Sequence, residues 1–478
     1  MKIDLKQLLD EQPDIYALIQ RLSDVAQARN LRAYLVGGFV RDLFIARKNK
    51  DIDIVVVGDG LAFADAVSSA LNAYPVVKFE EFGTAMIPLK QVDLEIVSAR
   101  SEVYQKHSRN PKVRFTGLDE DLKRRDFTIN SMAICINRDA FGEFIDPFRG
   151  MQDLKAQKII TPLDPQETFF EDPLRMLRAV RFAAQLSFVI EEKTFDAIVR
   201  DAQRIDIISK ERVRDEFLKI LMSPSPAWGI DLLYRSGLMA CLFPEIIALQ
   251  GVDSQEGLRH KDVYDHTLKV LENVALYEGD LILRLAALFH DIGKPRTKRF
   301  VEGSGWTFHG HEEVGARMFE KMGKILRLPA RDIKLVARLI RLHLRPIAVA
   351  DDGVTDSAIR RLMVEAGEDI DALLTLCRAD ITSKNPQRVK RYLSNFEQVE
   401  KRIAEVGEKD ALRAFQSPLD GKEIMQMFGL KPGPRVGTIK KHIEEAILEG
   451  EIENSYEAAK AYAEKNKEKL IDMYLINH

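Results

Sequence analysis

The chain has 478 residues, enough for about three domains of the usual size. Hydrophobic residues make up 46% of it and charged residues 30%, which excludes disordered and fibrous proteins. Its 71 Lys and Arg against 74 Asp and Glu give a net charge of −3, which excludes a uniformly basic nucleic-acid coat but allows local basic patches. No apolar run is long enough to cross a membrane, and no signal peptide is visible. The three cysteines stand too far apart to predict disulfides or a zinc knuckle. We therefore expect a cytoplasmic protein.

The hydrophobic pattern changes along the chain. In the first part, apolar runs typical of strands occur at 33–36, 51–57, 75–79 and 92–97. Between them, the spacing of apolar residues predicts helices at 39–46 and 61–73. Later segments carry helical spacing, at 168–186, 211–222, 262–277, 282–291 and 331–343. The pattern predicts an α+β fold in four parts: a mixed-sheet head (1–160), then a helical neck (161–245), a helical histidine-rich domain (246–400) and a helical tail (401–478).

The first chemical motif is YLVGGFVRD (34–42), followed by KDIDIVVVG (50–58). A strand ending at Val36 meets a Gly-Gly turn and a short helix, whose free N–H groups suit a phosphate. Asp51 and Asp53 alternate with isoleucines, so both carboxylates lie on one face of the strand. Paired carboxylates suit Mg²⁺ held together with substrate phosphates. The alternative for this motif alone is a solvated edge strand.

Two further motifs add charge to the head. Asp93 and Glu95 alternate on the strand 92–97, and a third carboxylate beside the pair would complete a two-metal site for nucleotidyl transfer. Arg124, Arg125 and Asp126 precede an apolar segment and suit triphosphate binding, although such a run is often an exposed turn.

The neck contains EDPLRMLRAVRFAAQL (171–186). In this segment Asp172, Arg175, Arg178 and Arg181 recur every three residues, a row that winds round the helix, so the four cannot all meet one small ligand. Asp172 and Arg175 together can imitate a base edge, while Arg178 and Arg181 can reach a phosphate or the head. The alternative is a salt-bridged surface helix.

These motifs, in this order over residues 30–245, resemble the class II tRNA nucleotidyltransferases, or CCA-adding enzymes, and bacterial poly(A) polymerases share the set. The resemblance implies a polymerase-β-like head. It implies nucleotide binding by Gly38, Arg41, Arg124 and Arg125, with Asp126 beside the sugar. It also implies Mg²⁺ binding by Asp51 and Asp53 with Glu95, rather than Asp93, as third carboxylate. In the neck it implies base reading by Asp172 and Arg175, with Arg178 and Arg181 as accessory arginines.

The resemblance further implies that two Mg²⁺ ions support addition of nucleotides from CTP and then ATP to the 3′ end of tRNA. The head motifs do not separate an enzyme that adds CCA from one that adds only A or only CC, or from a poly(A) polymerase. The sequence does not determine the oligomeric state.

A second constellation lies between 260 and 343, where six of the nine histidines fall. VYDHTLKVLENV (263–274), AALFHDIGKPRT (286–297), FHGHEEVGA (308–316), LIRLHLRP (339–346) and CRAD (377–380) resemble an HD-domain phosphohydrolase. His266, His290, Asp291 and Asp380 suit a transition metal such as Ni²⁺, Mn²⁺, Fe²⁺ or Co²⁺, and His311 and His343 are possible further ligands. The alternatives are a domain that only braces tRNA, or a phosphohydrolase whose head only binds RNA.

Two basic segments suggest further RNA contacts. In the tail, a Gly-Pro turn precedes Val436 and is followed by Lys440, Lys441 and His442. The run KNPQRVKR occupies Lys384–Arg391. Because charged runs are usually solvated faces, both remain hypotheses at this point.

Overall fold

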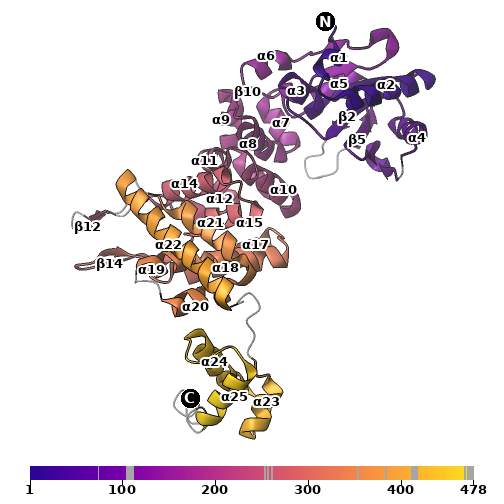
Figure 1. Ribbon diagram of the computed structural model, residues 1–478. Coiled ribbons are helices and arrows are strands. Elements are labelled where there is room, and N and C mark those ends of the chain that lie inside the picture. Colours follow the sequence, from indigo (N-terminus) through magenta and orange to yellow (C-terminus); the bar gives the residue numbers. More distant parts are fainter. Residues whose placement is uncertain are drawn as a thin grey trace. The chain divides into compact units, whose positions relative to one another are not determined.

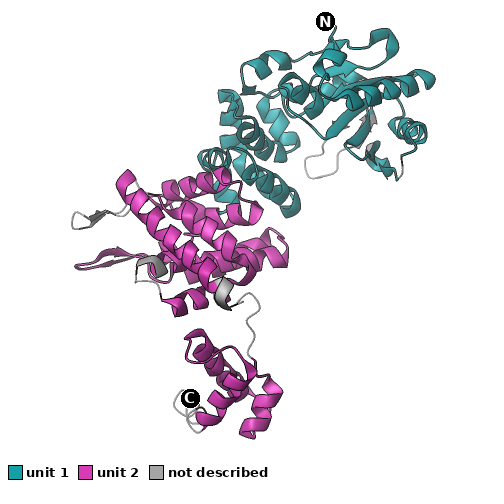
Figure 2. Cartoon of the chain, in the orientation of Figure 1, with its two compact units in different colours: residues 1–244 teal, residues 245–478 magenta. Residues whose placement is uncertain are grey.

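The computed structural model describes residues 1–73, 75–103, 112–251, 254–255, 258–259, 262–351, 355–382, 385–410, 418–467 and 470 (Figure 1). The chain forms two compact units, Met1–Pro244 and Glu245–His478 (Figure 2). The finer division into head, neck, histidine-rich domain and tail stays a prediction.

A seven-stranded mixed sheet forms the core of the head. β2 (Asp51–Val57) lies between β5 (Asp93–Ser98), which is parallel to it, and β1 (Arg32–Val36), which is antiparallel. The order is β3-β4-β5-β2-β1-β8-β9, with the remaining strands at Val77–Phe79 (β3), Thr84–Pro88 (β4), Ala133–Cys135 (β8) and Phe144–Ile145 (β9). The predicted mixed sheet is confirmed, although its third strand begins at Val77 rather than at residue 75.

The alternation of side chains along β2 determines where the site forms. Ile52 and Ile54 are fully buried, while Asp51 is exposed and Asp53 partly buried on the opposite face. Val55 shares the face of the aspartates and packs in one cluster with Leu118 and Leu122 of α5 (Leu118–Lys123). The segment after α5, which contains Arg124 and Arg125, is thereby brought to the two carboxylates.

The other helices of the first unit pack on the sheet and on one another. Those of the head are α1 (Leu5–Leu8), α2 (Pro13–Ala28), α3 (Gly37–Phe44), α4 (Gly60–Leu71) and α6 (Gly150–Lys155). Those after it are α7 (Pro165–Glu171), α8 (Leu174–Leu186), α9 (Glu192–Asp201), α10 (Lys210–Leu221), α11 (Pro226–Arg235) and α12 (Leu238–Leu242). The short helix α13 (Pro244–Ile247) spans the boundary between the units in the sequence. The helix expected over 168–186 is broken at Asp172, which is extended because the residue before a proline avoids the helical region.

Helices dominate the second unit. Its core includes α14 (Val263–Leu276), α15 (Leu281–Phe289), α17 (His311–Ile325), α18 (Ala330–Leu342) and α21 (Ile370–Asp380), and around them lie α16 (Lys294–Thr297), α19 (Arg345–Asp351), α20 (Asp356–Ala366) and α22 (Pro386–Asp410). α14 packs on α15 and α21, and α15 packs on α18. The contact between α14 and α21 brings together residues more than a hundred positions apart in the sequence, such as Asn273 and Ala379.

Short strands interrupt the regions that were expected to be helical. β10 (Lys158–Ile159) pairs with β11 (Val189–Ile190), β12 (Ser254–Gln255) with β13 (Leu258–Arg259), and β14 (Arg299–Val301) with β15 (Gly305–Thr307). The β14–β15 hairpin forms because Gly303 and Gly305 adopt positive φ and the rings of Phe300 and Trp306 meet across the strands at 5.3 Å. This hairpin was not predicted from the sequence, although glycines between two aromatic residues are a typical hairpin signal.

The last helices have a hydrophobic core of their own. α23 (Gly421–Phe428), α24 (Pro434–Leu448) and α25 (Tyr456–Lys465) bury Leu419, Ile424, Phe428, Ile439, Ile443, Ile447, Ala459, Ala463 and Leu470. Within the described ranges, no helix combines the length and the apolar character needed to cross a membrane.

Candidate functional site

A cavity of about 790 Å³ opens where the head sheet meets α8 and α10. Its lining includes every residue predicted for nucleotide and Mg²⁺ binding: Gly38, Arg41, Asp51, Asp53, Glu95, Arg124, Arg125, Asp126, Asp172, Arg175, Arg178 and Arg181. Asp93 lines it too. One cavity thus gathers residues from the sheet and from the helices after it.

Four carboxylates line this cavity from two strands. In the parallel pair β2–β5, Asp53 lies opposite Glu95, and Asp51 lies opposite Asp93. Burial raises the pKa of Asp53 to about 6, Arg125 opposes the rise, and the charges of Glu95 and Asp51 add to it. A divalent cation bound here would stabilise the ionised carboxylates, because it would offset the negative charge gathered around Asp53.

The Gly-Gly turn lies directly against the carboxylates. Gly37 has a φ of +68°, and a Cβ there would lie 2.7 Å from Asp53 Oδ2 and 2.9 Å from Arg125 Nη1, so only glycine fits. The helix begins at Gly37, and the N–H of Gly38 donates to the Asp53 carboxylate. Sequence reasoning expected free N–H groups here, but this one is already used to orient the carboxylate.

A buried acid that sequence reasoning missed holds the arginine pair. Asp121 is fully buried, and its two carboxylate oxygens accept from Arg124 Nη2 at 2.6 Å and from Arg125 Nη2 at 3.0 Å. Burial alone would raise the pKa of Asp121, but the two arginines lower it. The carboxylate therefore stays ionised and fixes both guanidinium groups beside the cavity. Its position three residues before the first arginine was the available signal.

Asp126 links the head to α8. Its carboxylate accepts from Arg178 Nε at 2.8 Å and from the Asn130 amide at 3.0 Å. Burial alone would raise the pKa of Asp126, but these contacts lower it to about 2. The expectation that Arg178 can reach the head is confirmed. Arg41 joins the same network by donating to Asn130 at 2.8 Å.

Arg181 makes its contact away from Asp126. Its Nε lies 2.7 Å from Oε2 of the buried Glu216 on α10, and its guanidinium carbon lies 4.1 Å from the centroid of the Phe182 ring. The alternative of a salt-bridged surface helix is therefore wrong for α8, whose arginines pair with residues of other segments.

Asp172 lies just before α8 and Arg175 in its first turn, but their side chains do not pair with each other. Asp172 Oδ2 accepts from Arg212 of α10 at 2.9 Å, and its other oxygen accepts from the Leu174 N–H at 3.1 Å. Arg175 donates to the Arg124 carbonyl at 2.7 Å and to Glu171 at 3.2 Å. Arg212 is a cavity residue that sequence reasoning missed, because its partner lies 40 residues earlier.

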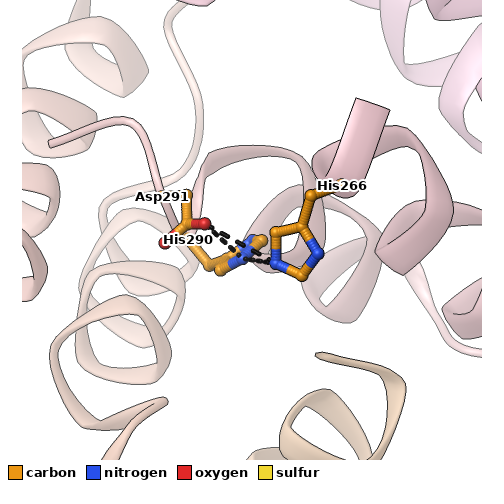
Figure 3. Close-up of side chains that lie close together, drawn as sticks. All are labelled: His266, His290 and Asp291. Carbon is orange, nitrogen blue, oxygen red and sulfur yellow. Dashed lines mark hydrogen bonds and ion pairs between the residues drawn. The ribbon is translucent and has the colours of Figure 1, made fainter. Parts of the chain in front are cut away.

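The second unit contains a buried cluster of imidazoles and carboxylates. His266 comes from α14, His290 and Asp291 follow α15, and Asp380 ends α21. His266 Nε2 lies 2.8 Å from Asp380 Oδ1 and 3.6 Å from Asp291 Oδ2, and His290 Nε2 lies 3.2 Å from Asp291 Oδ2. Figure 3 shows His266, His290 and Asp291 pointing toward one another. The structure thus brings together the four residues predicted from the sequence.

His311 and His343 extend the cluster on the other side of Asp291. Their Nε2 atoms lie 3.3 and 3.8 Å from Asp291 Oδ1. That oxygen and both Nε2 atoms are buried and have no hydrogen-bond partner among the described residues. Buried polar atoms left without a partner are costly, so this trio fits a cation that would satisfy all three.

The ring orientations also suit a metal. The Nδ1 atoms of His290, His311 and His343 donate to the carbonyls of Ala287, Phe308 and Ile340 at 2.7–2.9 Å. His266 Nδ1 lies 2.7 Å from Thr382 Oγ1. Hydrogen bonds at Nδ1 fix the ring so that Nε2 faces inward, as in most histidine metal sites. Burial lowers the pKa of His343 to about 4, so this ring is neutral near pH 7 and can ligate a cation.

The two basic segments take simple conformations. Lys440, Lys441 and His442 lie on α24, where the His442 Nδ1 is 3.2 Å from Glu445. In the run Lys384–Arg391, Lys384 lies outside the described residues, and residues from Pro386 onward form the start of α22.

Comparison with known proteins agrees with this arrangement. Three family models match: the Poly A polymerase head domain at residues 33–160, the "Probable RNA and SrmB- binding site of polymerase A" at 187–249, and the HD domain at 263–385. The fold and the cavity thus define a nucleotidyltransferase with an appended HD domain.

Relatives that match nearly the whole chain define the family more closely. The chain is 33% identical to an A-adding tRNA nucleotidyltransferase of Deinococcus radiodurans, over 89% of this chain and 94% of the relative. It is 31% identical to a CC-adding tRNA nucleotidyltransferase of Thermus thermophilus, over 89% and 92%. The chain therefore belongs to the tRNA nucleotidyltransferase family. The crystal structure of the Bacillus stearothermophilus CCA-adding enzyme in complex with CTP shares the fold, with a TM-score of 0.66 at 23% identity over 95% of this chain and 98% of that one.

Proposed function

We propose that this chain adds nucleotides to the 3′ end of tRNA and builds the complete CCA sequence from CTP and ATP. The observation that carries the proposal is the placement of Asp51, Asp53 and Glu95 on two paired strands at one cavity that arginines also line. In the reaction the 3′-hydroxyl oxygen attacks the α-phosphorus and loses its proton, and the bond to pyrophosphate breaks.

Family membership implies a divalent metal, and the donor set of the head fits Mg²⁺ because it consists only of carboxylate oxygens. Asp51 and Asp53 would hold the ions, and Glu95 would be the third ligand because it lies directly opposite Asp53. When bound, Mg²⁺ supplies charge neutralisation for the attacking oxygen and the leaving pyrophosphate. The strand pairing fixes the carboxylates before substrate arrives.

The arginines would position the triphosphate. Arg124 and Arg125 are held in place by Asp121, so less side-chain entropy is lost when they bind phosphate. Gly38 and Arg41 line the same cavity at the start of α3. Asp126 would act at the sugar edge while it anchors Arg178.

Base selection would rest on Asp172 and Arg175. Asp172 lies just before α8 and Arg175 in its first turn, and their side chains form ion pairs with Arg212 and Glu171 respectively. Cytosine and adenine each offer a donor and an acceptor that can replace these contacts. A base with the wrong pattern would leave polar groups unpaired, at a cost of about 1–3 kcal/mol each. Arg178 and Arg181 would support this helix and not touch the base.

The experiment uses tRNA transcripts that end before CCA, after C and after CC, each with a single nucleoside triphosphate. Sequential use of CTP, CTP and ATP would support the proposal. Extension of only the transcript that ends after CC, with ATP, would identify an A-adding enzyme. Extension of only the two shorter transcripts, with CTP, would identify a CC-adding enzyme. The names of the two relatives favour these alternatives. Long runs of A would identify a poly(A) polymerase. If no transcript is extended, the head serves only to bind RNA, and the histidine cluster would be the remaining active centre.

A second activity is supported by the histidine cluster. We propose that His266, His290, Asp291 and Asp380 would hold a transition metal, and that Asp291, His311 and His343 would hold a second ion. Such an ion supplies a water activated for attack on a phosphate ester. Lys294 Nζ lies 2.6 Å from Asp291 Oδ2, where it can meet substrate phosphate. Opening of 2′,3′-cyclic phosphates to monophosphates, or release of phosphate from terminal phosphates, in the presence of Ni²⁺, Mn²⁺, Fe²⁺ or Co²⁺ tests this proposal.

We also propose that α24 and the start of α22 contact RNA phosphates, since they carry the basic residues Lys440, Lys441, Arg388 and Arg391. An enzyme of tRNA maturation meets its substrates in the cytoplasm, where we place this protein.

A further inference from the structure

A second, smaller cavity of about 200 Å³ lies beside the histidine cluster. Asp380, Ile381 and Thr382 form one wall, at the end of α21. Tyr392, Asn395 and Phe396 form the opposite wall, on one face of α22, and Ile347 of α19 closes it. The cavity is too small for a whole nucleotide but has the size and the largely apolar lining that suit one flat ring system.

The cavity shares residues with the proposed metal centre. Asp380 lines the cavity, and the same carboxylate lies 2.8 Å from His266 Nε2. Thr382 lines it as well, and its hydroxyl is 2.7 Å from His266 Nδ1. A molecule held in the cavity would therefore have its reactive end next to the cluster.

The side chains of α22 match the chemistry of a nucleobase. Tyr392 is partly exposed and offers a ring face, and the buried Phe396 forms the base of the wall. Asn395 lies between them, and its amide makes no hydrogen bond within the described part of the chain, so both its donor and its acceptor are available. Aromatic rings bind unstacked bases by stacking, and amides bind their polar edges.

Two cations flank the aromatic ring. The guanidinium carbons of Arg391 and Arg388 lie 5.3 and 6.0 Å from the centroid of Tyr392. Both arginines are exposed, and both belong to the basic run noted in the sequence. They are placed to meet the phosphate that joins a base in the cavity to the preceding nucleotide.

We infer that this cavity binds the terminal base of an RNA 3′ end and presents its 2′,3′-cyclic or terminal phosphate to the histidine cluster. The inference rests on the phosphohydrolase activity proposed above and adds to it a binding site for the base, formed by residues of α21 and α22. For a cyclic phosphate, the oxygen of water bonds to phosphorus, one phosphorus–ribose oxygen bond breaks, and the proton goes to that oxygen.

Binding is measured first, without metal, so that no turnover occurs. A short RNA that ends in 2-aminopurine riboside 2′,3′-cyclic phosphate is titrated into the chelator-treated full chain, and its fluorescence is quenched when the base stacks. Tyr392→Ala should weaken the affinity for this RNA about tenfold. Tyr392→Phe should keep the parent affinity, because stacking needs the ring and not the hydroxyl. Tyr277→Ala, at an exposed tyrosine of the same unit, is the matched control. Equal affinity of Tyr392→Ala and Tyr277→Ala would overturn the inference.

Hydrolysis by the Ni²⁺-loaded chain separates this inference from the activity on which it rests. For adenosine 2′,3′-cyclic phosphate, Tyr392→Ala should raise KM about tenfold, while hydrolysis of glycerol cyclic phosphate, which has no base, should stay unchanged. Equal loss on both substrates would contradict the inference while leaving the phosphohydrolase intact. If the loaded chain hydrolyses neither, the phosphohydrolase proposal fails, and only the fluorescence titration decides whether the cavity binds a base.

Discussion

The two proposed metal centres are built differently. In the head, Asp51 and Glu95 are exposed at the wall of a wide cavity, and all candidate ligands are carboxylates. In the second unit, the side chains of His290, Asp291 and His343 are each 1% exposed, and the imidazole rings are fixed through Nδ1. The carboxylates of the head line a wide cavity, whereas most of the histidine cluster is buried and its Asp380 lines the smaller cavity beside it.

The difference in ligand type and burial predicts which ion each centre binds. Oxygen ligands in an open cavity suit Mg²⁺, which retains several waters and is completed by substrate phosphates. Inward-facing imidazoles with a shared carboxylate suit a transition metal held by the protein itself. The head ion should therefore arrive with the nucleotide, and the ion of the histidine cluster should remain with the protein during purification.

The largest expected effect is at the paired carboxylates. Asp51→Ala or Asp53→Ala should lower nucleotide addition about 100-fold or more, because the charge that holds the ions is lost, while tRNA binding survives. The check is addition of CTP to a tRNA transcript ending before CCA, with Asp10→Ala, at an exposed acid, as control. If both carboxylate variants retain more than about a tenth of the parent rate, the metal assignment is wrong.

The strand register makes a sharper prediction about the third carboxylate. Glu95 lies opposite Asp53, and Asp93 lies opposite Asp51 at the end of the strand. Glu95→Gln should therefore slow addition much more than Asp93→Asn, by about tenfold or more in the same assay. The reverse order would show that Asp93 is the ligand.

Base selection should depend on the start of α8. Asp172→Ala or Arg175→Ala should reduce discrimination against UTP and GTP about tenfold, because each base pattern is read by one or two polar contacts. Misincorporation and tRNA affinity are measured together. If misincorporation stays at the parent level, the pair only connects α8 to its neighbours.

These outcomes also show how far the sequence could predict the site. The alternation of Asp51 to Ile54 was enough to place two carboxylates on one face, since a strand has a period of two. Arg212 was missed because a motif shows which residues carry charge but not which distant residue pairs with them. Asp121 was missed although it stands only three residues before Arg124, because spacing alone does not show that its carboxylate is buried. Pro173 was a signal for the break in the helix before α8. The break was not predicted, because apolar residues keep helical spacing throughout 168–186. The positions of the histidine ligands were predictable, but the trio of Asp291, His311 and His343 with no hydrogen-bond partner became visible only in three dimensions.

The smallest effect concerns pH. The pKa of Asp53 is raised to about 6, so the folded protein holds this proton more tightly than the unfolded chain does, and the ionised carboxylate costs stability at neutral pH. That cost is relieved as the pH falls through about 6 toward the ordinary value of 3.8. Mg²⁺ needs the ionised form, so at limiting Mg²⁺ the rate of addition should fall about twofold between pH 7 and pH 6. Excess Mg²⁺ should restore it. A pH profile that does not depend on Mg²⁺ would contradict this account.

The most direct test of the contrast between the two centres is the metal content of the chain, purified without chelator, offered Ni²⁺, Mn²⁺, Fe²⁺ or Co²⁺, and dialysed against excess Mg²⁺. The account predicts that the parent and the Asp51→Ala/Asp53→Ala variant retain transition metal. The His290→Ala/Asp291→Ala variant should lose it and still add nucleotides to tRNA. A parent that holds no metal, or a histidine-cluster variant that folds but no longer adds nucleotides, would contradict the account.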